Sequence, residues 1–138
     1  MSDTLVDSNI LVDILHDDPE WEAWSEDKLE AARLLGNVVI NPLVYAEICA
    51  GYPLQRHVDQ ALSTSIYRRE NLPWEAAFNA GRAFVSYRRS GGVKRSPLPD
   101  FYIGAHAELR GYSLLTRNPS HYRQYFPNLK IIAPDTHP

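Results

Sequence analysis

Residues 4–15 read Thr-Leu-Val-Asp-Ser-Asn-Ile-Leu-Val-Asp-Ile-Leu and combine two hydrophobic patterns in one short stretch. Thr4-Leu5-Val6 is a short, mostly apolar run that ends at Asp7, which is typical of a buried strand. From Ser8 to about His16, apolar side chains recur at helical spacing, at Ile10, Leu11, Ile14 and Leu15. The stretch therefore predicts a strand that leads directly into a helix, with an acidic residue at the junction.

The alternation of strands and helices continues along the chain. Asn41 and Pro42, for example, offer an N-cap and a first-turn proline for a helix that follows a short apolar run. Further strands are expected at 38–40, 65–69, 112–115 and 130–132, and further helices at 20–35, 42–50, 55–63, 73–89 and 99–110. Such alternation favours right-handed βαβ units. We expect one α/β domain over residues 1–138, with a central parallel sheet of four or five strands and helices on both faces.

Three acidic residues stand where ligands gather in such folds, beyond the carboxyl ends of the strands. Asp7 ends the first strand, although an aspartate there is also a good N-cap. Glu47 shares the apolar face of its helix with Leu43 and Val44, which predicts an inward direction. A structural salt bridge, or a position at the helix rim, would also explain Glu47.

Asp100, like Asp7 and Glu47, has both a structural and a functional explanation. It stands in the first turn of its helix, where the helix dipole favours an acid, and it shares a stripe with Ile103, Gly104 and Ala107. The two small residues suit close packing of helix against sheet. Three carboxylates that lean inward would converge only if a cation offset their repulsion, and Mg²⁺ or Mn²⁺ prefers such oxygen ligands. The spacing leaves the metal site and the structural roles both open.

Other chemistries find little support. The five histidines and Cys49 have no zinc-ligand spacing, and the chain has neither a phosphate-binding glycine loop nor a G-x-S-x-G elbow. A lone cysteine forms no internal disulfide and suits a reducing cytoplasm, where we expect the protein. No apolar run approaches the roughly 20 residues of a membrane span, so no membrane partner is expected.

The net charge of −3 is unevenly distributed. Residues 1–30 hold ten acids and one lysine, whereas residues 31–138 hold seven acids and thirteen Lys or Arg. From Ala76 to Pro99 there is no acid, and the stretch contains Arg82, Arg88, Arg89, Lys94 and Arg95. These residues are candidate contacts for a phosphate backbone, or simply a solvated helix and loop.

Three segments that carry the acids, and a fourth near the end, resemble a known family. Residues 5–13 (LVDSNILVD), 41–48 (NPLVYAEI) and 98–107 (LPDFYIGAHA) are similar, in this order, to the successive motifs of PIN-domain nucleases. Residues 114–118 (LLTRN) and 122–127 (YRQYFP) resemble the closing segment of that family. The compact size resembles the VapC-type toxins of toxin–antitoxin pairs.

The resemblance implies a Mg²⁺- or Mn²⁺-dependent endoribonuclease that works as a homodimer and is inhibited by a cognate antitoxin. Asp7 and Asp100 would contact the metal directly or through water, Glu47 would complete the pocket, and Thr116 would line it. Ser8 and Asn9 would support Asp7. Arg117 is a further candidate contact with RNA. Trp21, Trp24 and Trp74 are candidate interface residues.

The chain departs from the family pattern at Asn118, where a fourth acid is common. An amide oxygen can still serve the site, but it brings no charge. Asn118 could equally act as an N-cap ahead of Pro119.

Two other functions stay open at this point. A PIN-like module could bind RNA or a protein without turnover. A metal nuclease could act on DNA or structured flaps, although the small chain shows no added clamp segment.

Overall fold

The computed structural model describes residues 2–95 and 98–138. Within them, the strands are β1 (Thr4–Val6), β2 (Val38–Ile40), β3 (Tyr67–Arg69), β4 (Ser113–Leu115) and β5 (Lys130–Ile132). The helices are α1 (Ser8–Leu15), α2 (Glu22–Leu35), α3 (Pro42–Cys49), α4 (Gln55–Ala61), α5 (Trp74–Arg89), α6 (Pro99–Arg110) and α7 (Ser120–Tyr125). No helix in this described part is long and apolar enough to cross a membrane.

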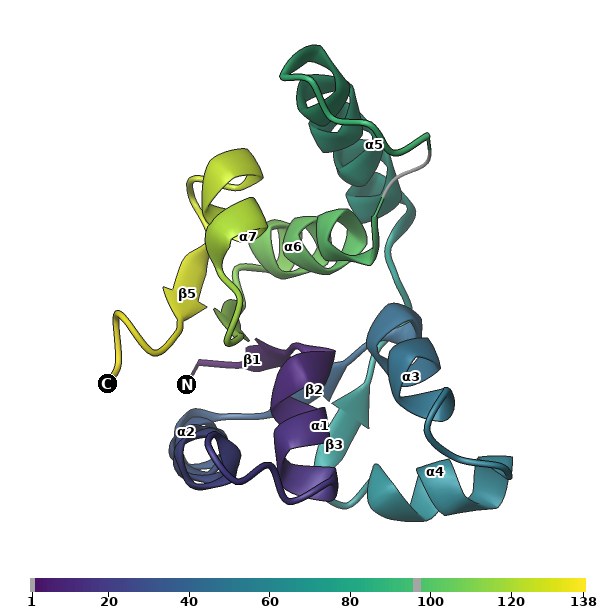
Figure 1. Cartoon of the computed structure of the whole chain (residues 1–138), viewed down its shortest axis with the longest axis vertical. Helices are drawn as coiled ribbons and strands as arrows, with labels where there is room; N and C mark the ends of the chain where they lie inside the picture. The colour runs from purple at the N-terminus through teal and green to yellow at the C-terminus, as the bar shows by residue number, and fades with distance from the viewer. Residues whose placement is uncertain (1, 96–97) are drawn as a thin grey trace.

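The five strands form one parallel sheet in the order β3-β2-β1-β4-β5. Thr4 of the central strand pairs with Val38 on one side and Ser113 on the other. The chain builds outward from β1 to β3 and then returns to the opposite side of β1 for β4 and β5. Because such crossovers are right-handed, this reversal puts the earlier and later helices on opposite faces. Figure 1 shows α1 and α2 below β1, and α6 and α7 above it. The expected α/β class, parallel sheet and helices on both faces are confirmed.

Local side chains explain where two helices begin. Asn41 caps α3, because its Oδ1 accepts hydrogen bonds from the backbone N–H groups of Leu43 and Val44. The helix expected from residue 20 begins instead at Glu22. Asp18 Oδ1 accepts from the backbone N–H groups of Glu20 and Trp21, so this segment forms a side-chain-bonded turn before the helix starts.

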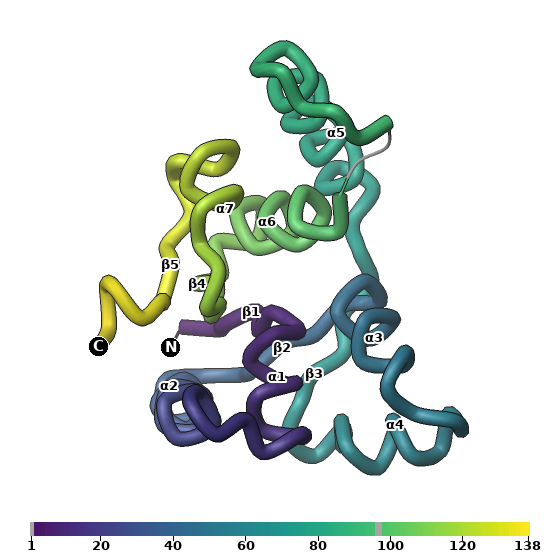
Figure 2. The backbone as a smooth tube through the Cα atoms, viewed as in Figure 1, coloured from purple at the N-terminus to yellow at the C-terminus, as the bar shows by residue number. Residues whose placement is uncertain are grey.

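The packing of α6 depends on a glycine. A Cβ atom at Gly104 would lie 2.6 Å from the Phe126 ring and 3.0 Å from Tyr122. The expected role of Gly104 in helix–sheet packing is therefore wrong, because the residue it lets approach is Phe126, directly after α7. Figure 2 shows α5 extending away from the sheet at the top of the view, where it packs against α6 and α7.

Candidate active site

Asp7 lies where the two halves of the sheet diverge. It follows β1 directly, caps α1, and donates its backbone N–H to Leu115 O at the end of β4. Ligands of parallel α/β sheets bind at such a switch point, where neighbouring connections leave on opposite faces. The Asp7 side chain is only 5% exposed. The position expected for Asp7 at the sheet edge is thus found, and its capping role is found with it.

Four groups donate hydrogen bonds to the Asp7 carboxylate. Thr116 Oγ1 and the Tyr122 hydroxyl lie 2.8 and 2.9 Å from Oδ2, and the backbone N–H of Ser8 lies 2.8 Å from Oδ1. Asn9 Nδ2 adds a longer contact of 3.4 Å to Oδ2. Burial raises the pKa of Asp7 despite these bonds, and the nearby charge of Asp100 acts in the same direction.

Tyr122 joins Asp7 to Asp100. Its hydroxyl lies 2.9 Å from Oδ2 of Asp7 and 3.4 Å from Oδ1 of Asp100, and its side chain is fully buried. Burial and the charges of the two aspartates raise the pKa of Tyr122 well above 10, so this hydroxyl stays a donor. Asp100 itself, in the first turn of α6, keeps 39% of its side chain exposed, and His121 Nδ1 lies 3.4 Å from its Oδ2.

Glu47 reaches the same edge by a different route. Its Oε1 accepts a hydrogen bond of 3.1 Å from Ser8 Oγ, so Ser8 supports both carboxylates. The expectation that Glu47 faces the core is wrong, because the residue is exposed while Val44 and Ile48 are buried. Glu47 therefore matches the alternative in which the residue lies at the rim of the helix. Partial burial of the carboxylate raises its pKa, and the charges of Asp7 and Asp100 add to this effect.

The three acids together concentrate negative charge at this edge of the sheet. Among the described residues, no Lys or Arg forms an ion pair with any of them. Nor does any group of three or more His, Cys, Asp or Glu side chains in residues 2–95 and 98–138 stand close enough to hold a metal alone. Mg²⁺ is often held by only one or two carboxylates together with water. A set of all-oxygen donors with excess negative charge fits a hydrated Mg²⁺ or Mn²⁺.

Comparison with known proteins identifies the fold that carries these acids. The model of the PIN domain matches residues 4–127. The chain belongs to the PIN-domain family. No curated protein sequence matches it significantly.

Solved structures named as VapBC or as a toxin–antitoxin complex contain similar folds. A chain of VapBC2 from Rickettsia felis, bound to a promoter DNA fragment, has a TM-score of 0.74 and 19% identity, covering 95% of this PIN domain protein and 98% of that chain. VapBC-1 from nontypeable Haemophilus influenzae gives 0.69 and 18%, covering 95% and 97%. A toxin–antitoxin complex from Klebsiella pneumoniae gives 0.64 and 24%, covering 94% and 95%.

Thr116 and Asn118 follow β4 in this PIN domain, but they play unlike roles. Thr116 is fully buried, and besides donating to Asp7 its hydroxyl accepts from Asn9 Nδ2 and from the backbone N–H of Asn118. Asn118 is exposed. The N-cap expected of Asn118 is wrong, because Pro119 occupies the cap position of α7 and no side chain caps that helix. The amide of Asn118 is therefore not committed to capping.

Arg117 is held inside this PIN domain by a buried acid. Its Nε and one terminal nitrogen lie 2.6 and 2.9 Å from the two carboxylate oxygens of Asp13, whose side chain is 1% exposed. Its guanidinium also lies 5.3 Å from the centre of the Trp21 ring. Arg117 is thus engaged in a structural ion pair, which argues against the expected RNA contact.

The other basic candidates lie on α5 and the loop after it, and residues 96–97 of that loop lie outside the described residues. Arg82, Arg88, Arg89, Lys94 and Arg95 are all exposed. Arg82 lines a pocket of about 530 Å³ between α5, α6 and the end of α7, away from the acids. Of the tryptophans expected at an interface, Trp74 is 92% exposed, whereas Trp21 and Trp24 are half-buried.

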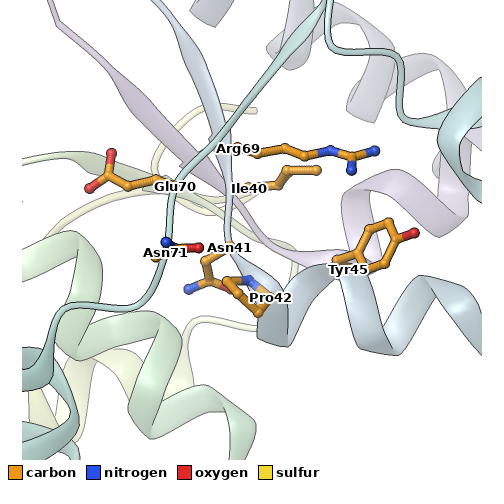
Figure 3. A pocket seen from close by; sticks show the side chains of 7 residues that line it. All are labelled: Ile40, Asn41, Pro42, Tyr45, Arg69, Glu70 and Asn71. Atoms are coloured by element: carbon orange, nitrogen blue, oxygen red, sulfur yellow. The ribbon is translucent and has the colours of Figure 1, made fainter.

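A second pocket of about 170 Å³ opens at the ends of β2 and β3 and contains none of the three acids. Figure 3 shows Arg69 and Tyr45 on one side of it, with the Glu70 side chain directed away from both. Glu70 Oε1 instead meets Nε2 of His106 at 3.0 Å, and Nδ1 of this fully buried histidine meets Asn41 Nδ2 at 3.1 Å. Because Asn41 Oδ1 caps α3, its amide nitrogen faces His106, which puts the ring proton on Nε2.

Neither Tyr122 nor His106 emerged as a polar partner from sequence patterns. Tyr122 lies in a six-residue helix with no clear periodicity, and its hydroxyl meets a residue 115 positions away. His106 lies six residues after Asp100 on the buried side of α6. The one available signal for His106 was a polar side chain within an otherwise apolar helical face, which requires a buried partner.

Proposed function

We propose that this PIN-domain protein is a metal-dependent endoribonuclease and the toxin of a VapBC-type toxin–antitoxin pair. The observation that carries the proposal is the meeting of Asp7 and Asp100 at the hydroxyl of Tyr122, with Glu47 linked to Asp7 through Ser8. Burial, and then the negative charges of the neighbouring acids, raise the pKa values of Asp7 and Glu47, so a compensating positive charge would favour the ionised form of both. A bound divalent cation would supply that charge.

In this proposal Asp7 and Asp100 hold Mg²⁺ or Mn²⁺ directly or through water, and Glu47 completes the donor set. When bound, such an ion lowers the pKa of coordinated water and stabilises charge that develops on a phosphodiester. The chain's own residues prepare the donors. Thr116 and Tyr122 both bond Oδ2 of Asp7 and thereby fix the direction of its lone pairs.

Ser8 performs the corresponding task for Glu47, whose exposed position gives it access to solvent water. We assign Glu47 the orientation of water and Asn118 an uncharged contact at the rim. The exposed Arg88, Arg89, Lys94 and Arg95 would attract the phosphate backbone.

Cleavage of labelled RNA by the purified protein tests the enzyme. Activity is expected with Mg²⁺ or Mn²⁺, and is expected to disappear in EDTA and in Asp7→Asn and Asp100→Asn. Asp135→Asn is a matched control, because Asp135 pairs with Arg123 on the surface. Full RNase activity in EDTA would refute metal-dependent cleavage, as would full activity of both site variants.

The proposed partners are a cognate antitoxin and a second copy of the chain. Similar folds occur in two VapBC structures and in a structure named as a toxin–antitoxin complex. Trp74 and Phe78, one turn apart on α5, are 92% and 67% exposed and are candidate contact residues. The product of a short neighbouring reading frame, co-expressed with this chain, is expected to copurify with it and suppress cleavage. Cleavage unchanged by a copurifying partner would exclude the inhibitory role.

A second candidate function is a PIN-like module that binds without turnover. Asn118 favours it, because an amide stands where the family pattern has an acid, and the described part of the chain contains no preformed group of three or more metal-binding side chains. Titration with Mg²⁺ during thermal unfolding separates the two candidates. A metal that binds the folded state at 100 times its Kd adds about 2.7 kcal/mol to the free energy of unfolding. An inactive module would show no such gain, and Asp7→Asn would match the wild type.

A further inference from the structure

Aromatic side chains of α5, α6 and α7 meet directly beside Asp100. We call Tyr87, His121 and Tyr125 the aromatic rim. Each packs on the buried ring of Phe101, with ring centres 5.6, 6.2 and 5.3 Å from it respectively. The rim residues also contact one another, since His121 lies 6.3 Å from both Tyr87 and Tyr125. The rim is therefore a supported surface in which each ring limits the movement of the next.

His121 is the member nearest the acids. Its Nδ1 lies 3.4 Å from Oδ2 of Asp100, yet 41% of its side chain is exposed. Its ring is tilted by only 30° from that of Phe101, which supports it from the protein side. An exposed ring backed by a buried one, in contact with a site acid, is placed to receive a flat group of a bound substrate.

A run of positive charge continues from the rim. We call Arg88, Arg89, Lys94 and Arg95 the basic segment, all of them exposed. Arg88 donates to Lys94 O across 2.6 Å, and the backbone N–H of Lys94 donates to the Tyr87 hydroxyl across 3.4 Å. A Cβ atom at Gly92 would lie 2.3 Å from the Tyr87 ring, so the loop packs closely on the rim. Charge and aromatic surface thus form one continuous feature.

We propose that the aromatic rim and the basic segment bind an unpaired segment of RNA, with one base stacked on His121 and its phosphates along the basic segment. This inference rests on the proposed function and assigns to His121 and the basic segment the positioning of the RNA strand. Stacking on aromatic side chains requires a base whose face is free, whereas bases in a duplex cover one another's faces. A base held on His121 would bring its neighbouring phosphate toward Asp100.

Binding measurements separate stacking from charge. Fluorescence anisotropy is recorded in EDTA with labelled 12-nucleotide single-stranded RNA, with the same RNA annealed to its complement, and with an abasic ribose-phosphate chain. The parent protein carries Asp7→Asn, so that the probe stays intact. To it are added His121→Leu, which removes the aromatic plane, or His121→Phe, which keeps it.

Loss of one stacked base is expected to weaken single-strand binding of the His121→Leu protein by about 5- to 150-fold. His121→Phe is expected to restore it, and both variants are expected to bind the abasic chain and the duplex like the parent. Retained abasic binding also shows that the Leu variant is folded. The inference is overturned if His121→Leu binds single strands like the parent, if His121→Phe is as weak as His121→Leu, or if the abasic chain is affected equally.

The outcome is independent of the enzyme assay. If the wild-type protein fails to cleave RNA while His121→Leu still weakens binding of the single strand and not of the abasic chain, the proposed enzyme is overturned and the stacking surface stands. Cleavage by the wild type combined with base-independent binding does the reverse.

Discussion

Tyr122 donates its hydroxyl proton to Oδ2 of Asp7 across 2.9 Å, although the two residues are 115 positions apart in the chain. The bond ties α7, on one face of the sheet, to the end of β1. Tyr122→Phe keeps the ring and removes the donor. Because hydrogen bonds to charged groups contribute about 1.5–3 kcal/mol, we expect a loss of this size in urea denaturation. We also expect the acid limb of cleavage to move to higher pH, since Asp7 loses a bond that lowers its pKa. Tyr125→Phe is the control, and an equal loss there would contradict this assignment.

The raised pKa of Asp7 has a measurable consequence for stability. Above its ordinary value of 3.8, the unfolded chain releases a proton that folded Asp7 still holds. The free energy of unfolding then falls as the pH rises through this interval. We expect the wild type to lose stability relative to Asp7→Asn as the pH increases from about 4 toward neutrality. Asp135 has a lowered pKa, caused first by its hydrogen bond from Arg123, so the wild type should gain stability relative to Asp135→Asn as the pH rises toward 3.8, an interval below the one that reports on Asp7. Parallel pH curves for the wild type and Asp7→Asn would refute the prediction.

The buried His106 is predicted to hold the N-terminus of the helix that carries Glu47. His106→Leu leaves the buried Asn41 amide without its partner, whereas Oε1 of Glu70 keeps its hydrogen bond from Arg110. One unsatisfied buried group costs about 1–3 kcal/mol, so a loss of this size in urea denaturation is expected. His57→Leu, at a half-buried histidine on α4, should change stability far less. A His106 variant as stable as the wild type would show that the network contributes nothing.

Arg117 is predicted to act on folding rather than on RNA. Arg117→Ala leaves Asp13 buried without its cation, a change that typically costs about 3–5 kcal/mol. Arg89→Ala, on the exposed face of α5, should instead weaken RNA binding and reduce its salt dependence with little effect on stability. Weaker RNA binding by Arg117→Ala at full stability would reverse this assignment.

The spacing of apolar residues along the chain was sufficient to predict much of this arrangement of strands and helices. Asp7 could be located because a three-residue apolar run and a helical repeat meet at it, and both are local features. Glu47 shows the limit of this reasoning. Helical spacing aligned it with Val44, but Val44 and Ile48 are the buried residues of α3, and Glu47 stays exposed. A helical repeat predicts on which face of a helix a residue lies. It does not predict how far the neighbouring layer of the structure covers that face.

Long-range polar contacts were beyond the reach of such patterns. The Tyr122–Asp7 and His106–Glu70 bonds join residues 115 and 36 positions apart, so no local spacing encodes them. The prediction that Asn118 acts as an N-cap was wrong for a related reason. The Asn-Pro pair matches a helix start, but Pro119 occupies the cap position itself, and α7 begins one residue later than that pair implies.

The geometry of the site depends on the small volume of Gly104. It lies four residues after Asp100 on α6, and the Phe126 ring occupies the space that any side chain there would need. Even one methyl group would act as a wedge between α6 and α7, the two helices that carry Asp100 and Tyr122. A wedged molecule would retain every acidic and hydroxyl group of the site while changing the gap between them. The distance between the carboxylates therefore depends on the absence of a side chain at Gly104 as much as on the groups that line the site.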